Sequence, residues 1–225
     1  MHSEPDFRPL RIALVHTTLP NPARAKEGGV TYFVHRLANK LVERGHLVTV
    51  ISSDPRPSDA QYEVWPMRAP RWATSNFPGR LFVVPLCLYR LPWQEFDVIH
   101  THGDDTLFFS RKRVRSLHGS ALGEFRSARR WKRRLGQAML YPLELLSAFT
   151  AKVAISQSVA TRAHFPFAST VIHYAVDTGV FFPGQKSIAP SILFVGTIAG
   201  RKRGDLLVQA FRDVIRPQIP DAELW

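Results

Sequence analysis

The sequence predicts an α/β protein built on a doubly wound parallel sheet. Short aliphatic runs with the length of buried strands recur along the chain, and stretches with helical spacing of apolar residues separate them. The 225 residues, 45% of them hydrophobic, are enough to form a packed core. Strands that alternate with helices are typical of a parallel sheet covered by helices on both faces.

The first β-α-β unit has the strongest pattern. RIALVH (11–16) and LVTVIS (47–52) predict buried parallel strands. Between them, from Val30 to Val42, apolar residues follow the i, i+3, i+4, i+7 spacing of a helix. Gly45 follows at the position of a left-handed C-cap, so the helix is expected to end just before it.

The alternation continues through the next hundred residues. Further strands are expected near 62–66, 96–103, 114–118, 152–155 and 170–173. Helical stretches are expected near 81–91, 125–149 and 157–164.

A second domain is expected after 181–190, where two prolines and a glycine interrupt the pattern. A strand (191–195), a helix (205–216) and an incipient strand, DAELW, follow. A single β-α-β unit cannot bury both faces of its sheet, so a truncated Rossmann-like fold is expected here. The predicted organisation is a first domain, a linker and the start of a second domain, over residues 10–183, 184–190 and 191–225.

Composition excludes several classes of protein. Cys87 is the only cysteine, so no intrachain disulfide can form and a reducing compartment is expected. The first residues carry Glu4 and Asp6 and lack a secretory pattern. The longest apolar stretch, 81–89, falls short of the ~20 residues that span a bilayer. We expect a cytoplasmic protein, at most peripheral on the cytosolic membrane face.

The net charge of +12 is concentrated in one segment, since residues 111–134 hold ten basic residues and one acid, Glu124. RSARRWKRR (126–134) is followed by apolar residues at helical spacing as far as Leu146, which is typical of a basic amphipathic element on an anionic membrane. A solvated helix face over a core stripe is the alternative. Nucleic acid is not favoured, because no binding motif accompanies the patch. The residues of this candidate acceptor or membrane surface are Arg126, Arg129, Arg130, Trp131, Lys132, Arg133 and Arg134.

Gly28 and Gly29 lie between the first strand and the first helix, at the sheet edge where open α/β proteins bind ligands. Glycines here allow a phosphate to approach the backbone, and the helix N-terminus offers N–H groups. The GxGxxG spacing is absent, so a nicotinamide cofactor is not expected. An ordinary glycine loop is the alternative.

Three histidines, His100, His102 and His118, fall at strand ends on the same edge. His100 and His102 share a strand face, but a third ligand with convincing spacing is missing, so no metal is predicted. His118, followed by Gly119, is the better candidate for contacting a substrate. A structural histidine is the alternative.

Cations follow the first strand of the second domain. Arg201 and Lys202 come after Gly196, and cations beside a glycine turn at a strand end suit a diphosphate. A solvated charged turn is the alternative.

Together these segments resemble glycosyltransferase family 4, retaining enzymes of the GT-B fold. The resemblance runs from about residue 11 to residue 225 and depends on the order and spacing of its pieces. The pieces are RIALVH, EGGVTYFVHRLANKLVERGHLVTVIS, FDVIHTHG, RVRSLHGS, AKVAISQSV, the VD and FFP of YAVDTGVFFP, and ILFVGTIAGRKRGDLLVQAF.

The resemblance implies two facing Rossmann-like domains, with the acceptor held mainly by the first and a nucleotide-sugar donor mainly by the second. Gly28 and Gly29 match the loop that approaches the donor diphosphate, and His118 matches the histidine near the transferred sugar. Lys202 matches the lysine that holds the diphosphate. The family's Gly-Arg-Leu is replaced by Gly196-Thr197-Ile198, which leaves Arg201 to take the place of the missing arginine.

The function implied is transfer of a sugar from a nucleotide sugar to a glycan or lipid-linked acceptor, with retention of configuration, in cell-envelope or polysaccharide synthesis. The nucleotide sugar is a substrate, and no cofactor or metal is implied. The family's paired glutamates would lie beyond Trp225, so these 225 residues are expected to be inactive by themselves. A GT-B nucleotide-sugar epimerase and a non-catalytic basic module for membrane or nucleic acid are the alternatives.

Overall fold

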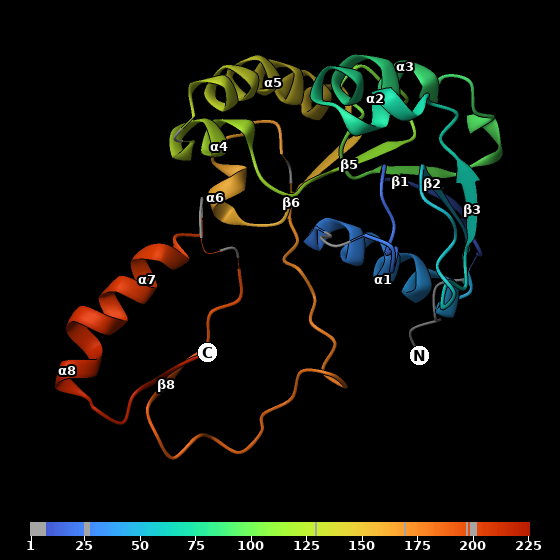
Figure 1. Ribbon diagram of the computed structural model, residues 1–225. Helices are drawn as coiled ribbons and strands as arrows, with labels where there is room; N and C mark the ends of the chain where they lie inside the picture. The colour runs from blue at the N-terminus through green and yellow to red at the C-terminus, as the bar shows by residue number, and fades with distance from the viewer. Residues whose placement is uncertain (1–7, 25–27, 129, 169, 197, 199–201) are drawn as a thin grey trace. The chain divides into compact units, whose positions relative to one another are not determined.

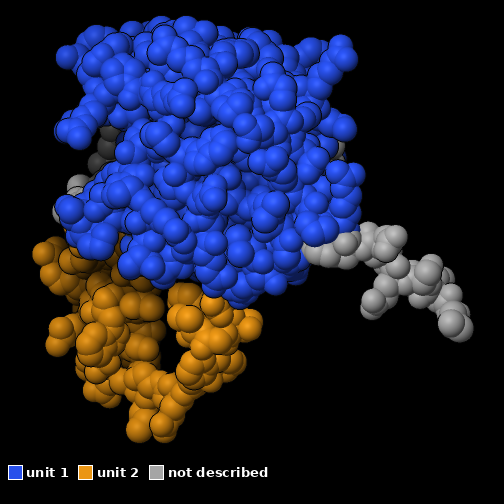
Figure 2. All heavy atoms as spheres, turned by 90° about the vertical axis from the view of Figure 1, so that its right-hand side faces the viewer, with its two compact units in different colours: residues 1–174 blue, residues 175–225 orange. Residues whose placement is uncertain are grey.

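The computed structural model describes residues 8–24, 28–128, 130–168, 170–196, 198 and 202–225. The chain divides into two compact units, residues 1–174 and 175–225, which Figure 2 distinguishes by colour. The predicted linker, 184–190, lies inside the second unit. The predicted domain limits stay a prediction.

In the described part of the first unit, seven parallel strands form one sheet in the order β3-β2-β1-β4-β5-β6-β7. The strands are β1 (Arg11–Val15), β2 (Leu47–Ser52), β3 (Glu63–Pro66), β4 (Val98–Thr101), β5 (Arg113–Leu117), β6 (Val153–Ser156) and β7 (Thr170–Val171). β1 is central, with Ile12 opposite Val48 on one side and Val98 on the other. The strand order reverses between β1 and β4, as in a dinucleotide-binding sheet.

Helices cover both faces of this sheet, which confirms the doubly wound prediction. The helices of the unit are α1 (Gly29–Glu43), α2 (Arg71–Ser75), the π-helical turn η1 (Gly79–Val83), α3 (Val84–Leu88), the 3-10 turn η2 (Trp93–Glu95), α4 (Ala121–Ser127), α5 (Trp131–Thr150) and α6 (Val159–Arg162). In Figure 1, α1 lies on one side of the sheet, and α2, α3 and α5 lie on the other.

The side chains on the two faces of β1 belong to two different hydrophobic clusters, because successive side chains of a strand point to opposite faces. Leu14 belongs to the cluster that contains Val34 of α1, and Ala13 to the cluster that contains Leu88 of α3. All four side chains are fully buried. A strand buried on both faces therefore appears in the sequence as a continuous aliphatic run.

Two helical predictions were imprecise. The stretch expected near 125–149 is two helices, because the backbone is extended at Ala128 and Arg130, with ψ 127° at each. The stretch expected near 81–91 begins earlier, at Gly79, and α2 precedes it. Gly79 permits a close approach of these segments, since a Cβ there would lie 2.4 Å from Ala73 Cα.

The second unit contains one β-α-β arrangement in its described part. Its elements are β8 (Ser191–Ile192), α7 (Gly204–Ala210), the π-helical turn η3 (Phe211–Ile215), α8 (Arg216–Gln218) and β9 (Glu223–Leu224). β8 and β9 pair in parallel, with Ser191 opposite Glu223. Leu193 and Val195, just after β8, are exposed.

Candidate functional site

The candidate site lies at the carboxyl edge of the sheet, where β1 and β4 part and ligands of open α/β sheets bind. The strands β1, β4 and β5 are followed directly by His16, His102 and His118, respectively. The backbone N–H of His102 donates to the Val15 carbonyl over 3.0 Å, so the hydrogen bonding between β1 and β4 continues as far as His102. His16 and His102 are buried, and His118 is partly exposed.

His118 is fixed by hydrogen bonds at both ring nitrogens. Its Nε2 lies 3.0 Å from Nδ1 of His102, and its Nδ1 lies 2.6 Å from the hydroxyl of Tyr174. The rings of His118 and Tyr174 stack at 15°. The hydroxyl of Tyr174, itself partly exposed, is thus the outer end of a chain that begins at buried His102.

Burial keeps these imidazoles neutral. Loss of solvent lowers the pKa of His118 to about 3, and the pKa of His16 and of His100 to about 4. The pKa of His102 is also well below its usual range, mainly through burial. At neutral pH the cluster therefore donates and accepts hydrogen bonds but carries no positive charge.

Phe33 links the start of α1 to His118. Its ring packs edge-on, with centroids 5.4 Å from His118 and 5.1 Å from Tyr174. Phe33 comes one helical turn after Gly29, and residues four apart share a helix face. The structure therefore brings the first turn of α1 beside the histidine, which joins two of the predicted sites.

The glycine pair forms the N-terminal entry to α1. Gly28 is the N-cap, its backbone is extended and no side chain caps the helix. A Cβ on either glycine would meet no described atom within 4 Å, so the space around both is open. The N–H groups of the first helical turn lack intrahelical partners and suit an anion. Their role as a phosphate site stays a prediction.

The loop after β4 holds two aspartates that the sequence interpretation did not select. Asp104 takes a left-handed conformation, φ 55°, after Gly103 and receives two hydrogen bonds from Arg80, at 2.9 and 2.8 Å. Asp105 is fully buried and pairs with Arg113 over 3.2 Å and with Arg115. Arg113 Nη2 in turn donates to the Ser147 carbonyl of α5 over 2.6 Å. Arg113, with its charge balanced by Asp105, therefore links β5 to α5.

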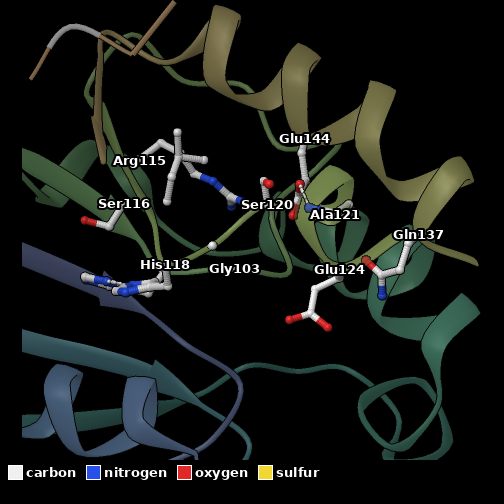
Figure 3. Close-up of a pocket in the computed structure, with 12 residues that line it drawn as sticks. Gly103, Arg115, Ser116, His118, Ser120, Ala121, Glu124, Gln137 and Glu144 are labelled. Atoms are coloured by element: carbon white, nitrogen blue, oxygen red, sulfur yellow. Dashed lines mark hydrogen bonds between the residues drawn. The ribbon is translucent and has the colours of Figure 1, made fainter. Parts of the chain in front are cut away.

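A cavity of about 220 Å³ opens beside His118, between the β5–α4 connection and α5 (Figure 3). In Figure 3 the Arg115 side chain extends toward Ser120 and Glu144. The Ala121 N–H donates to Glu144 Oε2 over 2.8 Å, which fixes that carboxylate. Burial raises the pKa of Glu144 and lowers that of Arg115.

The rings of His100 and His102 lie with their centroids 4.1 Å apart and are tilted by 35°, as neighbours on one strand face. His100 Nε2 bonds the Ser116 hydroxyl over 2.8 Å. Within the described residues, no group of three or more His, Cys, Asp or Glu side chains is placed to hold a metal ion.

The basic segment spans the end of α4 and the start of α5. Arg126 lies in α4, Arg130 is the N-cap of α5, and the three cations Lys132, Arg133 and Arg134 lie in the first turn of α5. Trp131 is 69% exposed. Arg129 lies outside the described residues. None of the helices that the structure describes is long and apolar enough to cross a membrane.

In the second unit, Gly196 lies beside Lys202, since a Cβ on the glycine would be 3.3 Å from Lys202 Cβ. The structure therefore pairs these two predicted donor-binding residues. Arg201, the third, lies outside the described residues.

A comparison of the sequence with models of protein families identifies the family of this chain. The model of Glycosyltransferase Family 4 matches residues 27–180, more than half of the chain. The chain belongs to glycosyltransferase family 4. The matched segment of this family 4 chain runs from the glycine loop through His102 and His118 to the residues after β7.

The fold of the family 4 chain is also that of a solved glycosyltransferase from Rickettsia africae ESF-5. The two share 11% identity at a TM-score of 0.50, over 97% of this chain and 68% of the other. With the parallel sheet described above, this likeness fits a fold of the GT-B type. No curated protein matches the chain by sequence.

Two residues of this site, Tyr174 and Phe33, were not selected from the sequence. Together with His102 they surround His118. Tyr174 lies 56 residues from His118 in the chain, and only the fold brings the two together. Phe33 matched the apolar spacing of α1 and gave no separate signal.

Proposed function

We propose that the protein transfers a sugar from a nucleotide-sugar donor to a hydroxyl of a glycan or lipid-linked acceptor, with retention of configuration. Family membership gives the reaction class. The observation that carries the finer proposal is the packing of Phe33 on His118, because it puts the open glycine loop next to the strand-end histidine. A diphosphate and the sugar attached to it need two such sites side by side.

Each candidate residue has a role in this proposal. The backbone N–H groups at Gly28 and Gly29 bind the donor diphosphate at the start of α1. Lys202, beside Gly196, adds a cation for the negative charge that grows on the leaving diphosphate. His118 lies beside the transferred sugar as a neutral group, because burial keeps its pKa at about 3. Both of its ring nitrogens are already bonded, so it positions the Tyr174 hydroxyl, which contacts the sugar.

Retention requires attack from the face that the diphosphate leaves. The acceptor oxygen forms the new bond to the anomeric carbon as the bond from that carbon to the phosphate oxygen breaks. The electron pair of the broken bond goes to the diphosphate, and the acceptor proton goes to a phosphate oxygen. The protein accelerates the transfer by positioning the acceptor oxygen at the anomeric carbon and by stabilising the charge on the leaving diphosphate.

The surface of α5 supports work at an anionic membrane, which we propose to be the cytosolic face during envelope or polysaccharide synthesis. Leu135 and Met139, which follow the basic segment, are 55% and 52% exposed. Three cations in the first turn oppose the helix macrodipole, so helix stability does not account for them. Lipid phosphates close to these cations would offset their unfavourable interaction with the helix macrodipole.

The test is sugar transfer by the full natural protein, with UDP-, GDP- and ADP-sugars and membrane extract as acceptor. We expect one donor to label a product whose anomeric configuration, read by NMR, equals that of the donor. Lys202→Ala should lower kcat/KM about 100-fold, the size of losing one charge-stabilising group. Lys152→Ala, at an exposed lysine after α5, is the matched control.

Other outcomes separate the alternatives. Formation of the epimeric nucleotide sugar, or of the nucleotide and the free epimeric sugar by hydrolysis, without transfer to an acceptor would favour the epimerase. Tight, salt-dependent polyanion binding with no transfer from any nucleotide sugar would favour the non-catalytic module. A product of inverted configuration would contradict retention alone.

A further inference from the structure

The loop between β1 and α1 is held beside the end of β2 by one carboxylate, that of Asp54. Its Oδ2 accepts a hydrogen bond from the Leu19 N–H over 2.9 Å. Nη2 of Arg24 lies 2.6 Å from Oδ1 and 2.8 Å from Oδ2 of the same carboxylate. The side chain of Asp54 is 11% exposed and that of Arg24 is 33% exposed, so the ion pair is shielded from most of the solvent. A residue that follows the neighbouring strand therefore fixes the loop at two points.

The backbone that carries Asp54 is itself held in place. The Thr17 carbonyl accepts from the Ser53 N–H over 3.0 Å and from the Ser52 hydroxyl over 3.1 Å. The Asp54 N–H donates to the Ser52 hydroxyl over 3.2 Å. These bonds continue the contact between β1 and β2 beyond the last strand residues, so the carboxylate extends from a fixed backbone to the loop it binds.

The same loop is bonded to the first turn of α1. The hydroxyl of Thr18 lies 2.8 Å from that of Thr31, which is buried in α1. The Thr31 N–H donates to the Gly28 carbonyl over 3.1 Å. Leu19 is fully buried and belongs to the hydrophobic cluster that α1 covers. The segment that Asp54 binds is thus joined by direct contacts to the glycine at which the helix begins.

The position of the glycine pair depends on its neighbours. A Cβ on Gly28 or Gly29 would meet no described atom within 4 Å, so no close packing fixes either residue. Glycine also has the widest choice of backbone conformation. The direction of the N–H groups at the start of α1 is therefore set from both sides, by Thr31 in the helix and by Arg24, four positions before Gly28.

We propose that Asp54 is a positioning residue for the donor: through Leu19 and Arg24 it holds the β1–α1 loop so that the N–H groups of the glycine pair point at the diphosphate. The inference rests on the proposed function, which assigns the diphosphate to those N–H groups. Arg24 acts as the counter-ion of Asp54 and not as a ligand of the donor. A loop that is already fixed does not have to be ordered when the donor binds, so the ion pair lowers the entropic cost of binding.

This role predicts a particular kinetic change. The diphosphate is bound in the ground state and in the transition state, so a looser loop weakens both and raises KM with kcat nearly unchanged. A purely structural role gives the opposite change, because a smaller folded fraction lowers the apparent kcat and leaves KM as it is. One assay therefore separates the two roles.

The test measures donor KM and kcat of the full natural protein, with UDP-glucose, GDP-mannose and ADP-glucose as probes and membrane extract as acceptor. Asp54→Asn keeps the size of the side chain and removes the charge that holds Arg24, and Arg24→Gln removes the same ion pair from the other side. Each should raise KM for the donor used about tenfold, the effect of losing one charge-assisted hydrogen bond. The double variant should be no worse than the single variants, because all of them remove one interaction.

Asp97→Asn is the matched control. Asp97 also accepts from a backbone N–H of the β1 region, that of Arg11 over 2.9 Å, but at the amino edge of the sheet. This variant should leave the donor KM unchanged. Arg24→Lys keeps a cation opposite Asp54 and should recover part of the affinity that Arg24→Gln loses.

Hydrogen exchange, followed by NMR of the 225-residue chain, gives a second reading that needs no donor. The Thr31 amide, which is bonded to Gly28, should exchange about tenfold faster in Asp54→Asn than in the wild type, because its turn is held less firmly. Asp97→Asn should keep the wild-type rate. An equal acceleration of the β1 amides would show global destabilisation instead of a local effect and would contradict the positioning role.

The inference fails if KM is unchanged in either variant, if kcat falls at constant KM, if the two effects add, or if the Thr31 amide keeps its rate in Asp54→Asn. A lower KM in Asp54→Asn with a higher one in Arg24→Gln would show that the released arginine binds the donor directly, which also contradicts it. Its failure is separable from that of the proposed function. A full protein that transfers no sugar contradicts the transferase proposal, and the exchange of Thr31 still decides whether Asp54 holds the glycine loop.

Discussion

Solvent exclusion at individual residues sets the chemistry of the candidate site. His16, His100, His102 and His118 all have a lowered pKa, and in each case burial is the largest cause. Each of them follows or belongs to a central strand, whose surroundings are covered on both faces. The same burial that makes His118 a neutral hydrogen-bonding group also makes the fold sensitive to acid.

A substitution of His100 tests whether buried histidines make the fold sensitive to acid. Burial alone lowers the pKa of His100 from 6.5 to about 4. As pH falls below 6.5, the unfolded chain binds the proton first, so the stabilisation present above that pH is lost on the way to pH 4. This one group should cost about 2 kcal/mol between pH 7 and pH 5. Urea unfolding at both pH values should therefore give a smaller loss for His100→Gln than for the wild type.

His173→Gln, at an exposed histidine, is the control for this comparison and should keep the full wild-type loss. An equal loss in the wild type and in His100→Gln would refute the assignment of the acid sensitivity to burial of this imidazole.

At the scale of elements, α5 combines tasks that usually belong to different helices. Its inner side carries Glu144 to the cavity and accepts a buried arginine at Ser147. Its outer side exposes Trp131, Leu135 and Met139 next to the basic segment. An apolar stripe of helical spacing is ordinarily a core face, and the exposure of Leu135 and Met139 in this stripe is the observation behind the proposed membrane contact.

We expect reversal of the charges at Arg130, Lys132 and Arg134 to glutamate to abolish flotation with anionic vesicles. Each basic residue near such a surface contributes about 1 kcal/mol, so affinity should fall by more than about 100-fold. Lys152→Glu, an exposed cation at the other end of α5, should retain binding. Equal binding of the wild type to neutral and anionic vesicles, or binding to neither, would rule out an electrostatic membrane contact.

At the scale of the whole molecule, the two compact units differ in burial. β1 is paired on both sides and carries side chains with no exposure, such as Leu14 and Val15. By contrast, every residue from 172 to 188 is exposed, from the end of the sheet into the second unit. Local opening costs little where few groups are buried.

Hydrogen exchange followed by mass spectrometry should reflect this difference. Peptides from 172–188 should exchange at the earliest times, whereas those from β1 and β4 should exchange only through large-scale unfolding. Protection of 172–188 equal to that of β1 would contradict the division into units.

The sequence by itself determined the sheet and the edge at which the site lies. Aliphatic runs such as 11–16 and 47–52 coincide with strands because a strand buried on both faces must be apolar throughout. His102, His118 and the glycine pair lie at the carboxyl edge, as expected, because parallel strands all end on one side. His100, expected at the same edge, lies inside β4. These properties depend on local pattern and on chain direction.

The tertiary structure alone decided which of these residues meet. His118 contacts His102 sixteen residues away and Tyr174 fifty-six residues away, and the cavity joins the β5–α4 connection to Glu144 on α5. Such contacts follow from how the strands are ordered and how the helices pack on them, which no local pattern encodes. For the same reason packing, and not spacing, decided that Leu135, Met139 and Leu146 of the apolar stripe of α5 are exposed, whereas Leu140 and Leu143 are partly buried.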